Sequence, residues 1–204
     1  MKYKVYITAS DKVLWALEHT SKAFNKYCPG LDVVVFGYSK PDFELPENFE
    51  FISMGVDRGV EYWAEDIYNA FLGIEDDYFI WSIEDYEFDK PLDFDMINKY
   101  CEKYIDEKTN WFGLSVGPSK RRHSVVEDCG EYQVIKLDQN ATYRIAVQFN
   151  IWNKKRLLHY LKMSFESDQM WSGYKPGTPW HFELMCSDHA NNDGYDIYAF
   201  KGRI

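Results

Sequence analysis

The chain has 204 residues, a length that suits one domain with a full core and is too short for two. Its formal net charge of −10 repels phosphate backbones, which disfavours a protein that coats DNA or RNA without sequence preference. Hydrophobic residues make up 46% and aromatic residues 18% of the sequence, and this composition excludes a disordered or low-complexity chain.

The N-terminal part of the chain predicts a β-α-β unit. Residues 3–8 are rich in β-branched and aromatic side chains, which indicates a strand. An amphipathic helix follows Asp11, and Pro29-Gly30 ends it. The Val-rich run 32–36 is typical of a strand covered on both faces, so a parallel sheet is expected. Asp11 is either the cap of this helix or a ligand contact beside the first strand.

The middle of the chain continues the alternation of strands and helices. A loop rich in Pro, Asp and Glu over 39–50 leads to a short strand at 49–54. Apolar residues at i, i+3, i+4 and i+7 then predict a helix over 57–72, with Asp57 as its cap. The apolar strand 78–83 runs directly into Glu84-Asp85-Tyr86-Glu87.

The rest of the chain contains shorter patterns with more turn residues between them, and Lys120-Arg121-Arg122 lies in a predicted loop. The expected elements are a helix at 97–105, strands at 111–116, 132–137, 143–149 and 195–200, a short helix at 154–161 capped by Asn153, and a helical turn at 182–186.

Several classes of protein are excluded by missing motifs. The four cysteines contain no C-x-x-C pair, which excludes a zinc ribbon and favours free thiols. No Gly-rich phosphate loop or G-x-S-x-G turn is present, which excludes P-loop NTPases, kinases and common serine hydrolases. The N-terminus enters a strand pattern directly, and no run approaches eighteen apolar residues. We expect a cytoplasmic protein, in the host cytoplasm if it is viral, with no membrane partner.

Acidic residues follow the buried strand 78–83 at the place where open α/β sheets bind ligands. Side chains at i and i+2 of an extended segment point to the same side, so Asp85 and Glu87 could share one Mg²⁺ or Mn²⁺ ion. Such an ion would neutralise a diphosphate leaving group. The alternative is a solvated turn, since Asp and Glu favour turns.

The order of these elements resembles the nucleotide-sugar half of GT-A glycosyltransferases. The matching features are the Trp-bearing helix, the strand, the acidic group, Pro91-Leu92-Asp93 and the next helix. The later patterns resemble the acceptor half of small bacterial or bacteriophage sugar transferases of this class, and they are Tyr143 to Gln148, Ile151-Trp152 with the helix 154–161, and Pro179-Trp180-His181-Phe182-Glu183.

The resemblance implies one α/β domain over 1–204 with a mainly parallel, Rossmann-like central sheet flanked by helices. Its nucleotide-sugar half would span about 1–118 and its acceptor half about 119–204. The implied activity moves a sugar from a nucleotide-sugar donor to an acceptor hydroxyl, with inversion at the anomeric carbon. The expected donor is a UDP-sugar. The acceptor would be a glycan or a modified DNA base.

The resemblance also implies roles for individual residues. Asp85 and Glu87 take the place of the Asp-x-Asp metal site, and Glu183 takes the place of the catalytic base. This sequence departs from Asp-x-Asp, so either Glu84 or Asp85 is the first ligand, and several such enzymes need no metal. The remaining assignments are Thr8, Ser10, Asp11, Glu84 and Arg144 for the donor, and Trp180, Trp152 and His181 for the acceptor. Arg58, near a helix start, and Lys120-Arg121-Arg122 are candidate phosphate contacts of the donor because arginine matches phosphate oxygens, and the alternative for them is a solvated basic loop.

Each assignment has a structural alternative. Glu183 could be a buried partner of Arg144 or of a lysine instead of a base. A tryptophan in a chain with seven of them is commonly a core residue. At the level of the whole protein, the alternatives are sugar transfer to modified bases of viral DNA, and a non-catalytic glycan- or nucleotide-binding protein on a degenerate transferase fold.

Overall fold

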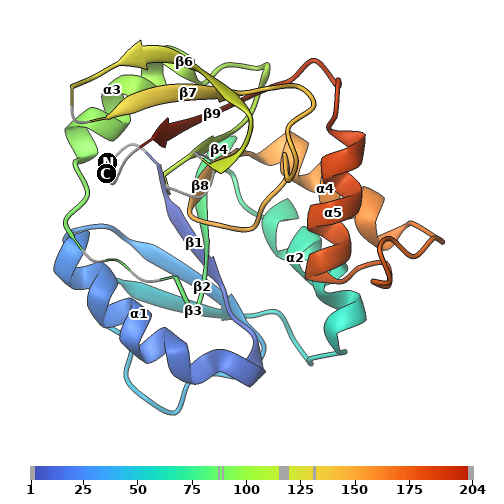
Figure 1. Ribbon diagram of the computed structural model, residues 1–204. Helices are drawn as coiled ribbons and strands as arrows, with labels where there is room; N and C mark the ends of the chain where they lie inside the picture. Colours follow the sequence, from blue (N-terminus) through green and yellow to red (C-terminus); the bar gives the residue numbers. More distant parts are fainter. Residues whose placement is uncertain (1–2, 87, 89, 115–119, 131, 202–204) are drawn as a thin grey trace.

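The computed structural model describes residues 3–86, 88, 90–114, 120–130 and 132–201. Within these residues, nine strands form one sheet in the order β3-β2-β1-β4-β8-β5-β9-β7-β6 (Figure 1). The strands are β1 (Val5–Thr8), β2 (Val33–Gly37), β3 (Phe49–Ser53), β4 (Tyr78–Ile83), β5 (Thr109–Gly113), β6 (His123–Asp128), β7 (Gln133–Leu137), β8 (Asn150–Asn153) and β9 (Asp196–Lys201). The helices are α1 (Leu14–Tyr27), α2 (Trp63–Leu72), α3 (Phe94–Tyr104), α4 (Lys154–Phe165) and α5 (Pro179–His189), with 3₁₀ turns η1 (Asp11–Val13) and η2 (Val60–Tyr62).

The first half of the sheet is parallel. β2 pairs with β1 and β3, and β1 pairs with β4, all in parallel. Every residue of β1 and β2 is buried, as expected of strands that are covered on both faces. The predicted β-α-β start and the strand that leads into Glu84 are therefore confirmed.

The second half of the sheet is mixed. β8 is antiparallel to β4 and β5, and β7 is antiparallel to β9 and β6, whereas β5 and β9 are parallel. Only β7 and β8 thus run against the other strands of the described chain. The prediction of a single α/β domain with a mainly parallel sheet is confirmed.

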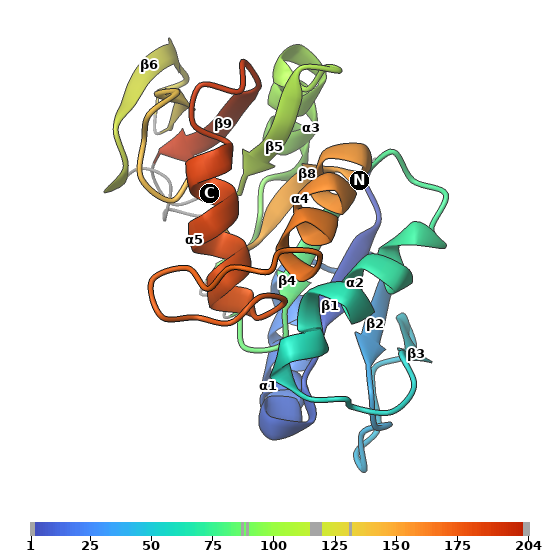
Figure 2. The ribbon, with the colours of Figure 1, turned by 90° about the vertical axis from the view of Figure 1, so that its right-hand side faces the viewer.

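Helices cover both faces of the sheet. α2, α4 and α5 share one hydrophobic core with alternate residues of β1 such as Tyr6. α1 and α3 share the other core, to which Val5 and Ile7 point. Figure 2, turned by 90°, shows α2, α4 and α5 together on the side that faces the viewer. Of the described helices, none has the length and hydrophobicity that a membrane span requires.

The region before α4 differs from the prediction. Residues 143–149 are irregular, and Tyr143 has a left-handed φ of 51°. The strand β8 begins only at Asn150, so Ile151 and Trp152 lie in a strand and not at the start of a helix. The buried side chains of Ile145 and Phe149 explain the error, because they imitate a strand pattern without forming a ladder. Asn153 does cap α4, since its side chain accepts a hydrogen bond from the backbone N–H of Arg156.

Other boundaries also differ. β6 is missed by the sequence patterns because it is an exposed edge strand, as Val125 and Val126 show. The predicted strand 111–116 is β5, which begins at Thr109, and residues 115 and 116 lie outside the described residues. α5 runs from Pro179 to His189 and is longer than the predicted turn.

Two predicted helix caps are wrong. The Asp57 carboxylate accepts a hydrogen bond from the Gly59 backbone N–H at 2.7 Å, within the turn before η2. The Asp11 carboxylate accepts hydrogen bonds from the backbone N–H and the hydroxyl of Ser39 at 3.0 and 2.7 Å. Asp11 therefore ties the segment after β2 to the start of η1, and it does not cap a helix.

Gly177 fixes the position of α5 relative to α2. Its φ is +78°, its carbonyl accepts a hydrogen bond from Ala64 at 2.9 Å, and its N–H donates to Ser164 at 3.1 Å. A Cβ atom at this position would lie 2.0 Å from the carbonyl oxygen of Glu61. Only glycine allows the chain to pass this close to η2.

We predict that Gly177→Ala lowers the free energy of unfolding by about 3 kcal/mol, through left-handed strain and a backbone clash. The matched control is Gly173→Ala in the same segment, where φ is +84° and no atom lies within 4 Å of the added Cβ. Urea unfolding should show a loss of about 1 kcal/mol for the control. Equal losses for the two variants would contradict a steric role for Gly177.

Candidate functional site

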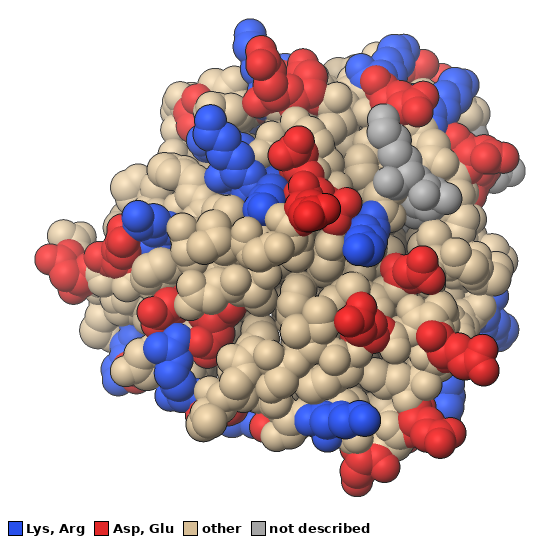
Figure 3. Space-filling model, turned by 180° about the vertical axis from the view of Figure 1, so that it is seen from behind, with Lys and Arg blue, Asp and Glu red and all other residues tan. Residues whose placement is uncertain are grey.

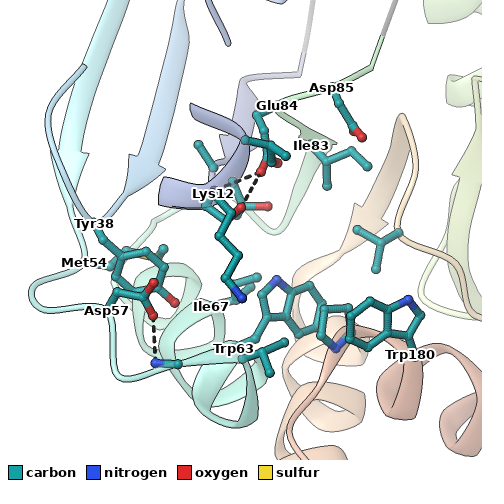
Figure 4. A pocket seen from close by; sticks show the side chains of 18 of the residues that line it. Lys12, Tyr38, Met54, Asp57, Trp63, Ile67, Ile83, Glu84, Asp85 and Trp180 are labelled. Carbon is teal, nitrogen blue, oxygen red and sulfur yellow. Dashed lines mark hydrogen bonds between the residues drawn. The ribbon is translucent and has the colours of Figure 1, made fainter. Parts of the chain in front are cut away.

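A cavity of about 480 Å³ lies where the parallel strands end. Its walls come from the residues that follow β1, β2, β3 and β4, and from the first turns of η1, α2 and α5. Figure 4 shows the side chains that line it. The carboxyl edge of a parallel sheet is the usual ligand site of open α/β folds, and helix N-termini there favour anions.

Glu84 joins the end of β4 to the end of β1 inside this cavity. Its carboxylate oxygen Oε1 accepts hydrogen bonds from the backbone N–H and the hydroxyl of Ser10, both at 2.9 Å. Its own carbonyl accepts a 2.6 Å hydrogen bond from the Thr20 hydroxyl on α1. Burial raises the pKa of Glu84, and the hydrogen bonds from Ser10 partly offset this. Glu84 and Ser10 thus form the floor of the site.

Thr8 and Tyr38 line the cavity as parts of the folded core. The Thr8 hydroxyl accepts a 3.0 Å hydrogen bond from the Trp81 indole, and the Tyr38 hydroxyl donates to Asp66 at 2.9 Å. Arg58 is paired with Asp66, lies 2.9 Å from the Glu65 carboxylate and stacks over the Tyr62 ring. Arg58 is not among the described residues that line the cavity, so a phosphate would compete with carboxylates for it.

Lys12 is a cavity residue that the sequence patterns do not reveal. It belongs to η1, and its side chain reaches into the cavity toward Trp63 (Figure 4). Among the described residues that line the cavity, it is the only cation beside four carboxylates, Asp57, Glu84, Asp85 and Glu183. The one available signal is its place four residues after β1, at the start of a helix.

Asp85 and Glu183 line the same cavity, although they are far apart in the sequence. Asp85 is exposed at the rim, after β4. Glu183 lies in the second turn of α5, where its carboxylate accepts a 2.7 Å hydrogen bond from the Val147 backbone N–H. Burial raises the pKa of Glu183, and the positive charge of Arg121 acts in the opposite direction. Glu183 is not paired with Arg144, which resolves one predicted alternative.

Trp180 lies three residues before Glu183, so the two side chains share one face of α5. Its indole is 50% exposed and also lines the cavity. The Tyr174 ring stacks behind it, with the ring centroids 5.6 Å apart. The predicted acceptor tryptophan is therefore beside the predicted base, with one ring face supported by the protein.

Three predicted ligand contacts are wrong, because the side chains have no access to solvent. Trp152 is a core residue between Trp81 and Trp111. His181 contacts the Ser164 hydroxyl and the Gln169 carbonyl oxygen, each at 3.0 Å. Arg144 donates hydrogen bonds to three backbone carbonyl oxygens, those of Asp138, Ala190 and Tyr195. It organises the irregular segment before β8.

The basic run 120–122 is only partly available to a phosphate. Arg122 lies 3.5 Å from the Asp138 carboxylate, and Arg121 lies against the Trp111 ring and near Glu183. On the face opposite to that of Figure 1, basic and acidic side chains are interspersed, and the described residues of that face form no basic patch (Figure 3).

The described residues do not form a metal site. No group of three or more His, Cys, Asp or Glu side chains among them could hold a metal ion. The Glu84 carboxylate is hydrogen-bonded to Ser10, so Asp85 is the remaining candidate for the first metal ligand. The second predicted ligand, Glu87, lies outside the described residues. The Mg²⁺ or Mn²⁺ ion stays a prediction.

Comparisons with known proteins show the fold. The synthetase of CMP-2-keto-3-deoxy-manno-octonic acid, solved with CTP, is 14% identical over 98% of this chain and 89% of that chain, with a TM-score of 0.52. The glycosyltransferase GlyE of Streptococcus pneumoniae TIGR4 is 11% identical over 96% of this chain, with a TM-score of 0.51. The match covers 45% of GlyE, so this chain spans less than half its length.

No protein-family model and no curated protein matches the sequence. The chain therefore has the fold that nucleotidyltransferases share with GT-A glycosyltransferases, and the predicted resemblance is confirmed at the level of the fold. Identities this low do not distinguish between the two activities.

We predict that Glu84→Gln is more stable than the wild type at pH 8, and that this advantage shrinks toward pH 5. The folded-state pKa of Glu84 is raised, so the stability that protonation supplies is lost as the pH rises through it. Glutamine keeps an acceptor for Ser10 and carries no charge. Glu84→Ala should be about 2 kcal/mol less stable than Glu84→Gln at both pH values, because the buried donors of Ser10 remain unpaired and neither variant titrates at this position. A Glu84→Gln advantage in urea unfolding that does not change with pH would contradict this.

Proposed function

We propose that this protein is a glycosyltransferase that moves a sugar from a nucleotide-sugar donor to an acceptor hydroxyl. The observation that carries the proposal is the convergence of Asp85, Glu183 and Trp180 on one cavity at the carboxyl edge of the parallel strands. Such convergence is what a reaction on one small substrate needs, and a binding protein has no need of it. The fold, shared with enzymes that handle activated sugars, supports the same conclusion.

In this proposal the two halves of the cavity hold different substrates. The nucleotide lies over the ends of β1 and β2, beside Ser10 and Tyr38, and the transferred sugar lies between Glu84 and Trp63. The acceptor enters beside Trp180, where a sugar ring can stack on the indole. Its hydroxyl then lies near Glu183.

The transfer is a single displacement. The Glu183 carboxylate takes the proton of the acceptor hydroxyl, and the acceptor oxygen forms the new bond to the anomeric carbon. The bond from that carbon to the donor phosphate oxygen breaks, and the nucleoside diphosphate leaves with the electron pair. Partial burial makes Glu183 a stronger base than a fully solvated glutamate, because burial raises its pKa.

Lys12 supplies positive charge for the leaving group. Negative charge grows on the donor phosphates during the displacement, so a cation placed there stabilises the transition state more than the ground state. Lys12 belongs to η1, at the edge of the cavity. Its positive charge also reduces the repulsion between the donor phosphates and the four carboxylates of the cavity.

A second candidate function is nucleotidyl transfer, which the nearly full-length match to the CTP-bound synthetase favours. In that reaction a sugar acid or phosphate attacks a nucleoside triphosphate and releases pyrophosphate. A triphosphate carries more negative charge than a nucleotide sugar, and four carboxylates with one lysine suit it less well. The released product separates the two activities.

We predict that a donor nucleotide sugar raises the melting temperature, and that Lys12→Met weakens donor binding about tenfold, as expected for the loss of a charge-assisted contact. The screen uses UDP-, GDP-, CMP- and dTDP-sugars and CTP, each with EDTA or Mn²⁺. A ligand at a hundred times its dissociation constant stabilises by about 2.7 kcal/mol. Lys22→Met, on the exposed surface of α1, is the control and should bind as the wild type does. If none of these nucleotides stabilises the protein, the non-catalytic binder becomes the better explanation.

We predict that Glu183→Gln lowers the transfer rate by about 10²- to 10⁴-fold and leaves donor affinity within about twofold. In the wild type the rate should rise with pH through the raised pKa of Glu183 and then level off, because only the carboxylate accepts the proton. Asp188→Asn, exposed on the same helix, is the control and should keep the wild-type rate. Release of pyrophosphate from CTP by both variants at equal rates would instead support nucleotidyl transfer.

A further inference from the structure

A second hollow lies beside the segment that joins α4 to α5. This segment, residues 166–178, loops out beside the start of α5 in Figure 2. The hollow has a volume of about 430 Å³. Its apolar wall is formed by Met163, Met185 and Trp171, and its polar rim includes Asp168, Gln169 and His189. No residue of this hollow takes part in the proposed transfer.

Aromatic side chains connect the cavity to this hollow. Trp180 lines the cavity and stacks on Tyr174, with 23° between the ring planes. Tyr174 and Trp171 pair through two backbone hydrogen bonds of 2.9 and 3.0 Å, and Trp171 lies against the ring of His189 in the hollow. We call Trp180, Tyr174 and Trp171 the aromatic track. Trp180 and Tyr174 are 50% and 39% exposed, so a ligand can reach both rings.

The track is held in place before any ligand arrives. Ser172 and Gly173 have left-handed φ values of 48° and 84°, and they close the turn between the two paired aromatic residues. Lys175 forms a 2.5 Å ion pair with Glu61, and Gly177 is packed against η2. A rigid binding surface loses little conformational entropy when a ligand binds.

We propose that the aromatic track binds a saccharide chain, so that the acceptor is an oligosaccharide or a longer glycan and not a single sugar. This inference rests on the proposed transfer and names the class of its acceptor. The accepting hydroxyl lies at Glu183, the terminal sugar stacks on the free face of Trp180, and the following sugars pass the exposed part of Tyr174 and reach the hollow at Trp171.

The chemistry of the track matches a saccharide better than other ligands. A pyranose ring has an apolar C–H face that packs on an aromatic ring, and hydroxyl groups around its edge. Asp168, Gln169 and His189 offer acceptors and donors for such hydroxyls at the edge of the apolar wall. A purely apolar partner would bury these polar groups without replacing their hydrogen bonds to water. A nucleic acid would meet the carboxylates of Glu166 and Asp168.

The test begins with an array of immobilised glycans of defined structure, probed with the whole 204-residue chain. The glycan bound most strongly is then titrated as its mono-, di-, tri- and tetrasaccharide, with tryptophan fluorescence as the readout. We expect affinity to increase with chain length, by about tenfold or more from monosaccharide to tetrasaccharide, since each stacked ring adds a contact. Trp171→Ala should reduce the affinity for the tetrasaccharide to that for the disaccharide and leave the monosaccharide unaffected.

Further variants distinguish a loss of saccharide binding from a loss of folding. Tyr174→Ala changes an exposed side chain and should weaken the tri- and tetrasaccharide about tenfold, whereas Tyr174→Phe should restore the stack and the affinity. Trp15→Ala, which removes a 67% exposed tryptophan from α1, should bind like the wild type. Affinity that is independent of chain length, or an array on which the wild type binds no better than Trp171→Ala, would overturn the inference.

Donor binding separates this inference from the proposed function. If nucleotide sugars stabilise the wild type and Tyr174→Ala equally while affinity does not depend on chain length, the saccharide track is wrong and the transfer survives. If chain-length dependence is present but no nucleotide sugar binds, the track stands and the transfer fails.

Discussion

The hydrogen bonds between Glu84 and Ser10 are the interaction on which the site depends. They join the ends of two neighbouring parallel strands at the point where the chain turns from β1 into η1 and from β4 toward the rim. The Thr20 hydroxyl adds α1 to the same junction through the Glu84 carbonyl. Because Glu84 holds Ser10, the direction of η1 is set and Lys12 enters the cavity. Because Glu84 points inward, its neighbour Asp85 is left at the rim.

The charges of the site oppose the stability of the fold. Burial raises the pKa of both Glu84 and Glu183, so each carboxylate is less stable in its charged form here than it would be in water. Glu84 is compensated by hydrogen bonds that build the floor of the cavity. Glu183 is compensated by one backbone N–H and by the field of Arg121, and it remains open to the cavity. A half-buried carboxylate that remains open to the cavity is the arrangement that a general base requires.

Sequence patterns predicted the parallel half of the sheet because its strands are buried on both faces and read as continuous apolar runs. The patterns failed where burial does not coincide with backbone pairing. In residues 143–149, Ile145 and Phe149 are buried but do not belong to a strand, whereas β6 is a strand that is mostly exposed. For the site, position after a strand correctly placed Glu84 and Asp85 at the cavity. Residue type alone failed for Trp152, His181 and Arg144, since an aromatic or basic side chain can equally well fill a core. The sequence patterns did not identify Lys12, because no neighbouring residue indicates the direction of its side chain.

α5 connects the two halves of the cavity. Trp180 and Glu183 face the cavity from its first turns, while His181 and Phe182 on the opposite side lie in the core and fix the rotation of the helix. The close contact of Gly177 with η2 fixes its distance from α2, whose first turn lines the donor side. The acceptor side is thus placed by a single glycine contact and one buried helix face, and residues 166–174 belong to neither constraint. Substitutions in residues 166–174 can alter which acceptor binds without moving Glu183, whereas substitutions at Gly177 displace base and platform together.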